Sequence, residues 1–253
     1  MKKDIPTTQL CRYDETDIFV RERNLCKEVI GRMSFTDFMF LQIMGRPCGS
    51  TERAVIDAAL VTLCEHGLTP SAIAARLTYY GAPESLQGAI AAGLLGVGSH
   101  FVGTMENCAK VLQEILNGQE PVEKAARNVV SRFRAAKQAL PGFGHPHHRP
   151  DDPRPAALFA AGRAAGVNGR YIATLETLSR EVDGAFGRHM TINATGAIAA
   201  LMLEIDVPPE LMRGFAVLSR AAGLIGHLYE EQRNPSGSAI WKAADKAVPY
   251  TAE

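Results

Sequence analysis

Apolar residues recur every three or four positions over most of the chain, and this spacing is typical of amphipathic helices. Ser34 is a suitable N-cap for the first helix, and Ser50 or Thr51 for the second. The stretch 189–205 consists mainly of small apolar residues, which predicts a helix buried on all sides. The predicted helices cover residues 34–44, 53–65, 70–80, 84–95, 104–117, 121–140, 156–165, 169–182, 189–205 and 209–227.

The two ends of the chain lack this period. Residues 1–20 are polar and predict an extended arm with a short strand near residues 17–21, and the tail from residue 233 is polar and irregular. No alternating strand pattern follows the first twenty residues. The fold class is therefore predicted to be all-α, with roughly ten helices.

The longest break between predicted helices is the segment 141–154, which reads PGFGHPHHRPDDPR. Its prolines exclude a regular helix, because each lacks an N–H and clashes with the preceding turn. Gly142 and Gly144 permit a tight turn and a close approach of the backbone to a ligand. We expect a stiff polar loop that presents the imidazole of His145 and the guanidinium of Arg154 for catalysis or binding.

Composition narrows the class of protein. The charges balance at 27 basic and 27 acidic residues, which argues against a nucleic-acid partner. The five cysteines form no CxxC pair and are expected to be reduced thiols of a cytoplasmic protein. No apolar run reaches the roughly 18 residues of a membrane span, and the N-terminus lacks the pattern of a signal peptide.

Three histidines, His66, His100 and His145, lie beside glycines at the ends of predicted helices. An imidazole titrates near neutral pH and can transfer protons when its ring nitrogens are free. A capping or core role is commoner for any single histidine, but three such positions bring catalysis to roughly even odds. A metal site at His145, His147 and His148 is disfavoured, because no cysteine or carboxylate pattern completes a zinc site. We therefore expect no metal.

Two arginines stand out as possible binders of carboxylates. Arg220 lies in an apolar helical segment, where a charge needs a partner, and Arg154 ends the central loop. The guanidinium fork suits a bidentate carboxylate. The alternative for Arg220 is an internal ion pair with Glu204 or Asp206.

Several motifs resemble one known family. The G-x-G-H at 142–145 followed by D-P-R at 152–154 resembles a signature of the citrate synthase superfamily, with the same nine-residue step from histidine to arginine. The segment 219–227 resembles its R-x-x-G-x-x-x-H helix. The E-H-G at 65–67 and the glycine-rich stretch 93–103 are more similar to the citryl-CoA lyase branch, which includes the lyase module of ATP-citrate lyase. The resemblance runs from about residue 18 to 230.

This resemblance implies a citrate synthase-like fold with a large and a small lobe, and a homodimer. Residues 21–253 would form one domain behind the arm 1–20, with the small lobe at roughly 145–215. A CoA thioester and a 2-oxo acid would be the small-molecule ligands, and no cofactor would be needed. The implied site consists of His66, His100 and His145 for catalysis, Arg154, Arg220 and His148 for carboxylates, and Pro141, Gly142, Phe143 and Gly144 for CoA.

The sequence departs from the family pattern at two places. The family's catalytic aspartate lies in N-V-D-G, whereas this chain has Thr195 in that position and Asn193 as the other candidate. The G-x-G-H motif is followed by Pro146, His147 and His148, which alters the substrate pocket. Without the aspartate, deprotonation of acetyl-CoA is hard to explain, because neither replacement is a base at neutral pH.

The functional hypothesis is therefore a citryl-CoA lyase-type enzyme. It would cleave citryl-CoA, or a related 3-hydroxy-3-carboxyacyl-CoA, to an acyl-CoA and a 2-oxo acid. The first alternative is a condensing citrate or methylcitrate synthase, and the second is a CoA-thioester-binding protein without turnover. The homodimer is expected to pack through the small-residue helices at 87–95 and 195–203.

Overall fold

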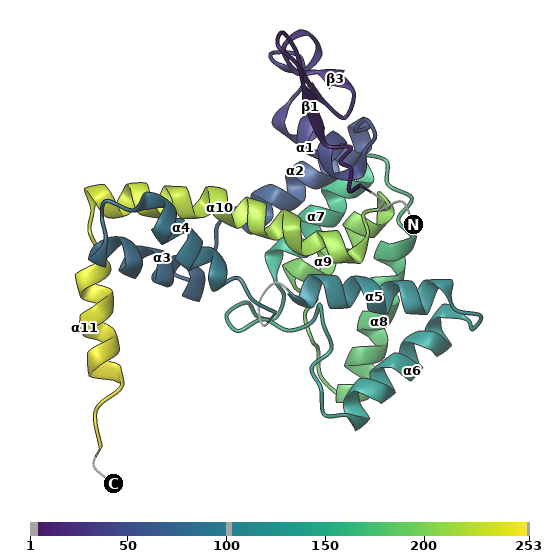
Figure 1. Cartoon of the computed structure of the whole chain (residues 1–253). Coiled ribbons are helices and arrows are strands. Elements are labelled where there is room, and N and C mark those ends of the chain that lie inside the picture. The colour runs from purple at the N-terminus through teal and green to yellow at the C-terminus, as the bar shows by residue number, and fades with distance from the viewer. Residues whose placement is uncertain (1–4, 100–102, 252–253) are drawn as a thin grey trace.

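The computed structural model describes residues 5–99 and 103–251. Eleven α-helices account for most of these residues, which confirms the predicted all-α class (Figure 1). In this described part, no helix is both long enough and apolar enough to cross a bilayer. The helices pack in two clusters of unequal size, and one long helix, α10 (Pro209–Arg233), runs through both.

The N-terminal region folds back on itself as a small antiparallel sheet. Its strands are β1 (Cys11–Tyr13), β2 (Ile18–Val20) and β3 (Arg23–Asn24), in the order β1-β2-β3. In the β1–β2 register Arg12 faces Phe19, and its guanidinium lies 3.8 Å from the ring centroid. The predicted short strand is present as β2. The expected extended arm is wrong for residues 11–20, because strands of two or three residues are too short to give a visible period.

The larger cluster contains the main hydrophobic core. Its centre is α9 (Ala194–Glu204), in which every residue from Gly196 to Leu203 is buried. Around it pack α1 (Phe35–Met44), α2 (Ser50–Cys64), α5 (Gly103–Asn117), α6 (Val122–Ala135), α7 (Pro153–Ala164), α8 (Arg170–Phe186) and the first half of α10.

Two sequence predictions change with this core. The helix expected over 189–205 begins only at Ala194, because the Asn193 side chain caps it by accepting the Gly196 N–H. Helices α7, α8 and α9, assigned to a small lobe at about 145–215, share the core with α1 and α2. Because residues 196–203 of α9 are buried inside the subunit, they cannot contact a second subunit, and the expected dimer contact through 195–203 is wrong.

The smaller cluster projects from the main body (Figure 1). It is made by α3 (Pro70–Gly81), α4 (Leu86–Leu95) and the second half of α10, with Ala72, Ala75 and Leu224 at its centre. The helices approach closely, since a Cβ added to Gly93 would lie 3.0 Å from the Ala75 Cβ.

Two local predictions at helix ends are wrong. The tail from residue 233 is not irregular, because α11 (Gly237–Ala247) follows α10 directly and packs against α3 at Tyr80. The cap of α2 is Gly49 instead of Ser50 or Thr51. The Thr51 hydroxyl donates to the Ala165 carbonyl at the end of α7, so a tertiary contact uses the group that the local pattern assigned to capping.

Candidate active site

Four segments from both parts of the molecule contribute to the candidate site. The loop after α2 carries His66, and the loop between α6 and α7 carries His145 and His148. Thr195 lies in the first turn of α9, and Arg220 lies in the middle of α10. The predicted residue His100 lies outside the described residues.

Three imidazoles meet at the centre. The ring centroids of His66 and His145 are 5.4 Å apart in an edge-on arrangement, and His148 stacks on His145 at 4.2 Å. The loop reaches this position because Gly142 and Gly144 have φ angles of 89° and 79°, which favour glycine. A Cβ at Gly142 would lie 2.6 Å from the Cys108 sulfur, so no larger residue fits there.

The hydrogen bonds of His145 fix its tautomer. Its Nδ1 accepts the backbone N–H groups of His147 and His148, both at 3.1 Å. An accepting Nδ1 in a neutral ring leaves the proton on Nε2. Burial, and then the charges of His148 and Arg154, lower the pKa of His145 to about 4. At neutral pH this side chain is therefore an uncharged hydrogen-bond donor.

The same tautomer bears on metal binding. One ring nitrogen from each of His66, His145 and His148 lies within 4.8 Å of the other two, which is close enough to suggest a metal ion. However, a protonated Nε2 has no lone pair for a metal, and the Nδ1 of His145 already accepts two backbone N–H groups. The chemistry of this ligand set therefore disfavours a metal.

His66 is also held in its neutral form. Burial lowers the pKa of its imidazole, and the nearby charges of Arg154 and His148 act in the same direction. Its lone-pair nitrogen can accept a proton, while His145 offers one. The site thus contains a proton acceptor and a donor side by side, both uncharged at pH 7.

Arg154 is engaged by a neighbouring carboxylate. Its Nε and Nη2 donate to Asp152 at 2.9 and 2.7 Å. Asp152 is buried and also accepts the N–H of Ala194 at 3.2 Å, so the pair ties the central loop to α9. Two of the three guanidinium nitrogens of Arg154 are used in this way. Among the described residues Nη1 has no hydrogen-bond partner, which leaves it to meet a ligand.

Arg220 has unused bonding capacity. Its Nη1 is buried, and among the described residues it has no hydrogen-bond partner. Neither internal partner expected from the sequence bonds this nitrogen. Glu204 accepts N–H groups at the start of α8, including that of Tyr171 at 2.6 Å, and no ion pair joins Asp206 to Arg220 among the described residues. A buried guanidinium nitrogen without a partner favours a ligand carboxylate at this point.

The position of the family's aspartate is occupied by a neutral, fully bonded unit. The Thr195 hydroxyl donates to Asn193 Oδ1 at 2.7 Å and lies 3.0 Å from the Thr104 hydroxyl. The Asn193 amide oxygen also caps α9, and its Nδ2 donates to the Gly144 carbonyl at 3.0 Å. Asn193 therefore acts as a structural bridge between α9 and the central loop.

A cleft of about 570 Å³ opens beside this site, between α5, α6 and the start of the central loop. Pro141, Gly142 and Phe143, three of the four residues predicted to contact CoA, line it. Gly144 lies outside the lining, and its N–H donates to the Thr191 carbonyl at 2.8 Å. Lys110 also lines the cleft but was missed, since its helical pattern is that of any exposed lysine.

Known proteins match both the sequence and the fold. The citryl-CoA lyase of Hydrogenobacter thermophilus superposes with a TM-score of 0.86 and 28% identity, over 98% of this chain and 95% of that one. An ATP citrate lyase of Methanosaeta concilii, at 18% identity, gives a TM-score of 0.82 over 98% of this chain and 42% of that one, which indicates a shared fold alone.

Comparison of amino-acid sequences also finds relatives among citrate synthases. "Putative citrate synthase 2" of Mycobacterium tuberculosis is 29% identical over 183 residues, which cover 70% of this chain and 47% of that protein. The chain thus spans about half the length of this relative. The family model for the C-terminal domain of citrate synthase matches residues 23–243. The chain belongs to the citrate synthase family.

Proposed function

We propose that the protein is a citryl-CoA lyase-type enzyme. It would cleave citryl-CoA, or a related 3-hydroxy-3-carboxyacyl-CoA, into an acyl-CoA and a 2-oxo acid. The observation that carries this proposal is the pair of uncharged imidazoles, His66 and His145, beside the buried, unpartnered Nη1 of Arg220. The overall likeness to a citryl-CoA lyase, at 28% identity, supports it.

In the proposed reaction, Arg220 Nη1 and Arg154 Nη1 bind carboxylates of the citryl unit. His66 accepts the proton of the tertiary hydroxyl, and His145 Nε2–H donates to the same oxygen as negative charge develops on it. The bond between the hydroxyl carbon and the thioester's α-carbon then breaks. Its electrons form the enolate of the acyl-CoA, while the hydroxyl carbon becomes the carbonyl of the 2-oxo acid.

The proton balance closes without a carboxylate. The enolate takes a proton at its α-carbon, either directly from the imidazolium of His66 or from a water molecule that receives the imidazolium proton in exchange, and the acyl-CoA is released. His66 is thereby returned to its neutral form. The CoA part would occupy the cleft beside Pro141 and Phe143, where Lys110, which pairs with Glu106 at 2.7 Å, would offer its ammonium to phosphates. No cofactor takes part in this sequence of steps.

The alternative functions make different predictions. A condensing synthase must remove a proton from acetyl-CoA, and Thr195 and Asn193 are not bases. A CoA-binding protein without turnover would explain the cleft but not the two adjacent neutral imidazoles of His66 and His145. For these reasons the cleavage reaction is preferred.

The test is turnover of synthetic citryl-CoA by the purified protein, with the 2-oxo acid measured by coupled reduction to its hydroxy acid. We expect cleavage by the wild type, and its loss in His145→Ala with unchanged circular dichroism. Condensation is tested by release of CoA thiol from acetyl-CoA and oxaloacetate. Cleavage that persists in His145→Ala would refute the assignment of roles, and tight CoA binding without turnover would support the binding protein instead.

We also propose a homodimer that forms through the smaller cluster. The α3–α4–α10–α11 unit exposes Leu95 and Trp241 by 87% and 60%, together with Ile225 and Tyr229. Large apolar side chains exposed on one unit of a subunit are typical of an interface. Light scattering at micromolar concentration should give twice the monomer mass, and Trp241→Glu should shift it towards one. The free cysteines suit the predicted cytoplasmic location, which stays a prediction.

A further inference from the structure

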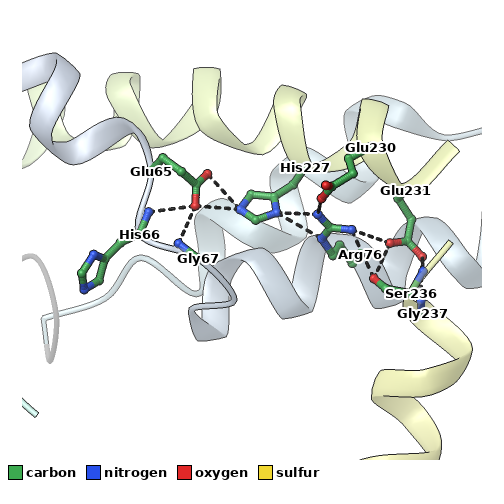
Figure 2. A network of polar contacts seen from close by, with 9 residues as sticks. All are labelled: Glu65, His66, Gly67, Arg76, His227, Glu230, Glu231, Ser236 and Gly237. Atoms are coloured by element: carbon green, nitrogen blue, oxygen red, sulfur yellow. Dashed lines mark hydrogen bonds and ion pairs between the residues drawn. The ribbon is translucent and has the colours of Figure 1, made fainter. Parts of the chain in front are cut away.

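A chain of polar contacts, buried at Arg76, His227 and Glu231 and half-exposed at Glu65, leads from the start of α11 to the loop that carries His66 (Figure 2). Its central member is His227, on α10, which the proposed mechanism does not use. His227 is only 8% exposed. Its Nε2 lies 3.1 and 2.9 Å from the two carboxylate oxygens of Glu65, and its Nδ1 lies 3.0 and 2.9 Å from Nε and Nη2 of Arg76.

The partners of His227 fix its tautomer. A guanidinium has only N–H donors and keeps its charge at every accessible pH, so Nδ1 must accept from Arg76. The ring proton therefore lies on Nε2 and is donated to Glu65. A neutral imidazole thus bridges a buried cation and a carboxylate, and each of its nitrogens has one defined role.

The Glu65 end of the chain holds the backbone of the candidate active site. Glu65 Oε1 accepts the N–H groups of His66 at 2.8 Å and Gly67 at 2.5 Å. The His66 ring points away from Glu65 on the other side of the loop (Figure 2). Burial opposes ionisation, but these N–H groups and His227 hold the pKa of Glu65 below its usual value. Glu65 is thus an anion at neutral pH that fixes the peptide from which His66 projects.

The Arg76 end is anchored to the junction of α10 and α11. Arg76 is 3% exposed and donates to Glu231 at 2.7 Å, and Glu230 contacts it from the surface. Glu231 also accepts the N–H groups of Ser236 at 2.7 Å and Gly237 at 2.6 Å, which start α11. The path from α11 to His66 is therefore continuous, and each internal link is a charge-assisted hydrogen bond.

We infer that His227 is a positioning residue for His66. It acts through Glu65, and the anchored Arg76 fixes its own orientation. This inference rests on the proposed function for its kinetic consequence, because His66 is taken as the proton acceptor there. A shift of about 1 Å in a reacting group can cost roughly 100-fold in rate, so loss of this support should reduce turnover more than binding.

Two substitutions separate the two nitrogens of His227. In His227→Gln the side-chain amide N–H replaces Nε2–H and can still donate to Glu65. In His227→Asn the shorter side chain places its oxygen near the Nδ1 position, where it accepts from Arg76 but does not reach Glu65. We expect kcat for citryl-CoA cleavage to fall about 100-fold in His227→Asn, with KM changed less than threefold, and to recover to within about tenfold of wild type in His227→Gln.

The control is Glu230→Gln, which removes the exposed contact to Arg76 but keeps the path through His227 and Glu231. Its kcat should stay within twofold of wild type. If the role of His227 were purely structural, both His227 variants would melt at lower temperatures. Their kcat values, calculated per folded molecule, would then be equal to each other. That result, or an unchanged kcat in His227→Asn, overturns the inference.

A second measurement does not depend on turnover. The ring ¹H–¹⁵N resonances of His66 should shift in His227→Asn and return towards wild type in His227→Gln. If wild-type protein fails to cleave citryl-CoA but these shifts follow the expected order, the proposed function fails and the positioning role stands. If His66 resonances are the same in all variants, the positioning role fails whatever the enzyme does.

Discussion

Thr195→Asp restores a carboxylate at the position where the family has its catalytic aspartate. The structure allows the stability cost to be worked out. The change removes the Thr195 hydroxyl donor to Asn193, a hydrogen bond of 2.7 Å and a contribution of about 1 kcal/mol. The new carboxylate also faces the Asn193 oxygen, which has lost one of its two donors. Asn193 keeps the Gly196 N–H, so the cap of α9 survives.

Two gains offset this loss. Position 195 lies in the first turn of α9, where a negative charge stabilises the helix by about 0.3–1 kcal/mol. The Thr104 hydroxyl, 3.0 Å from that of Thr195, can donate to the new carboxylate. The net change in unfolding free energy should therefore stay within about 1 kcal/mol, which corresponds to roughly 2–4 °C in melting temperature for a chain of this size.

The expected gain is in proton transfer at the acyl α-carbon. General bases contribute about 10²- to 10⁴-fold, so exchange of deuterium into acetyl-CoA should rise by at least about 100-fold in Thr195→Asp. Mass spectrometry of acetyl-CoA after incubation in D₂O measures this rate. Thr195→Asn, which has the same shape without the charge, is the matched control and should exchange as slowly as wild type.

Two outcomes would refute the reasoning. Rapid exchange by wild-type protein would mean that another group removes the α-proton, and the argument from the absent carboxylate would fail. Equal exchange by Thr195→Asp and Thr195→Asn, with both folded, would mean that position 195 does not face the acyl group.

Three further predictions concern the core and the charged groups. Gly223→Ala should lower the unfolding free energy by about 1–3 kcal/mol or more, because its Cβ would lie 1.9 Å from the Cys64 carbonyl oxygen. Gly226→Ala, with open space around it, should not destabilise the protein, and urea unfolding of both variants checks this. Arg154→Lys should raise KM for citryl-CoA and lower the melting temperature, because a point charge cannot replace the fork on Asp152; unchanged kinetics would leave Arg154 as a structural ion pair alone. The unfolded state binds a proton on His145 below its ordinary pKa of 6.5 and the folded state only below about 4, so unfolding free energy should fall as pH drops from 6.5 to 4; urea unfolding across this range should give a shallower slope for His145→Asn.

The meeting of His66 and His145 could be predicted because each lies in a short motif that resembles a known family. The helices with strong apolar periods were also predictable to within a few residues, as α1 and α5 illustrate. The start of α9 was not, because Met190 and Ile192 continue the apolar pattern before it, whereas the Asn193 side chain caps the helix. The same side chain also makes a tertiary contact that the local pattern does not show, because its Nδ2 donates to the Gly144 carbonyl.

The network of His227 had no local signal. Arg76 and His227 are 151 positions apart, and neither residue type at its own position indicates the other. The same holds for α11, whose start is fixed by the Glu231 carboxylate and by packing of Gly237 on Tyr80. A serine- and glycine-containing stretch after a proline reads as a loop unless that support is known.

Some side chains of the candidate site match the family motif and others replace it, and this difference bears on whether the site favours cleavage or condensation. Two groups are proposed to meet the 2-oxo acid half. They are Arg220, whose buried Nη1 has no partner among the described residues, and His145, whose Nδ1 accepts two backbone N–H groups and leaves Nε2–H as its donor. The group that would handle the α-proton is replaced by Thr195, whose hydroxyl is already bonded to Asn193. A site built in this way can act on a hydroxyl and stabilise the alkoxide, which cleavage requires first. The described residues offer no equivalent base for starting at the acyl α-carbon, where condensation must begin, and so the proposed cleavage reaction fits these side chains better.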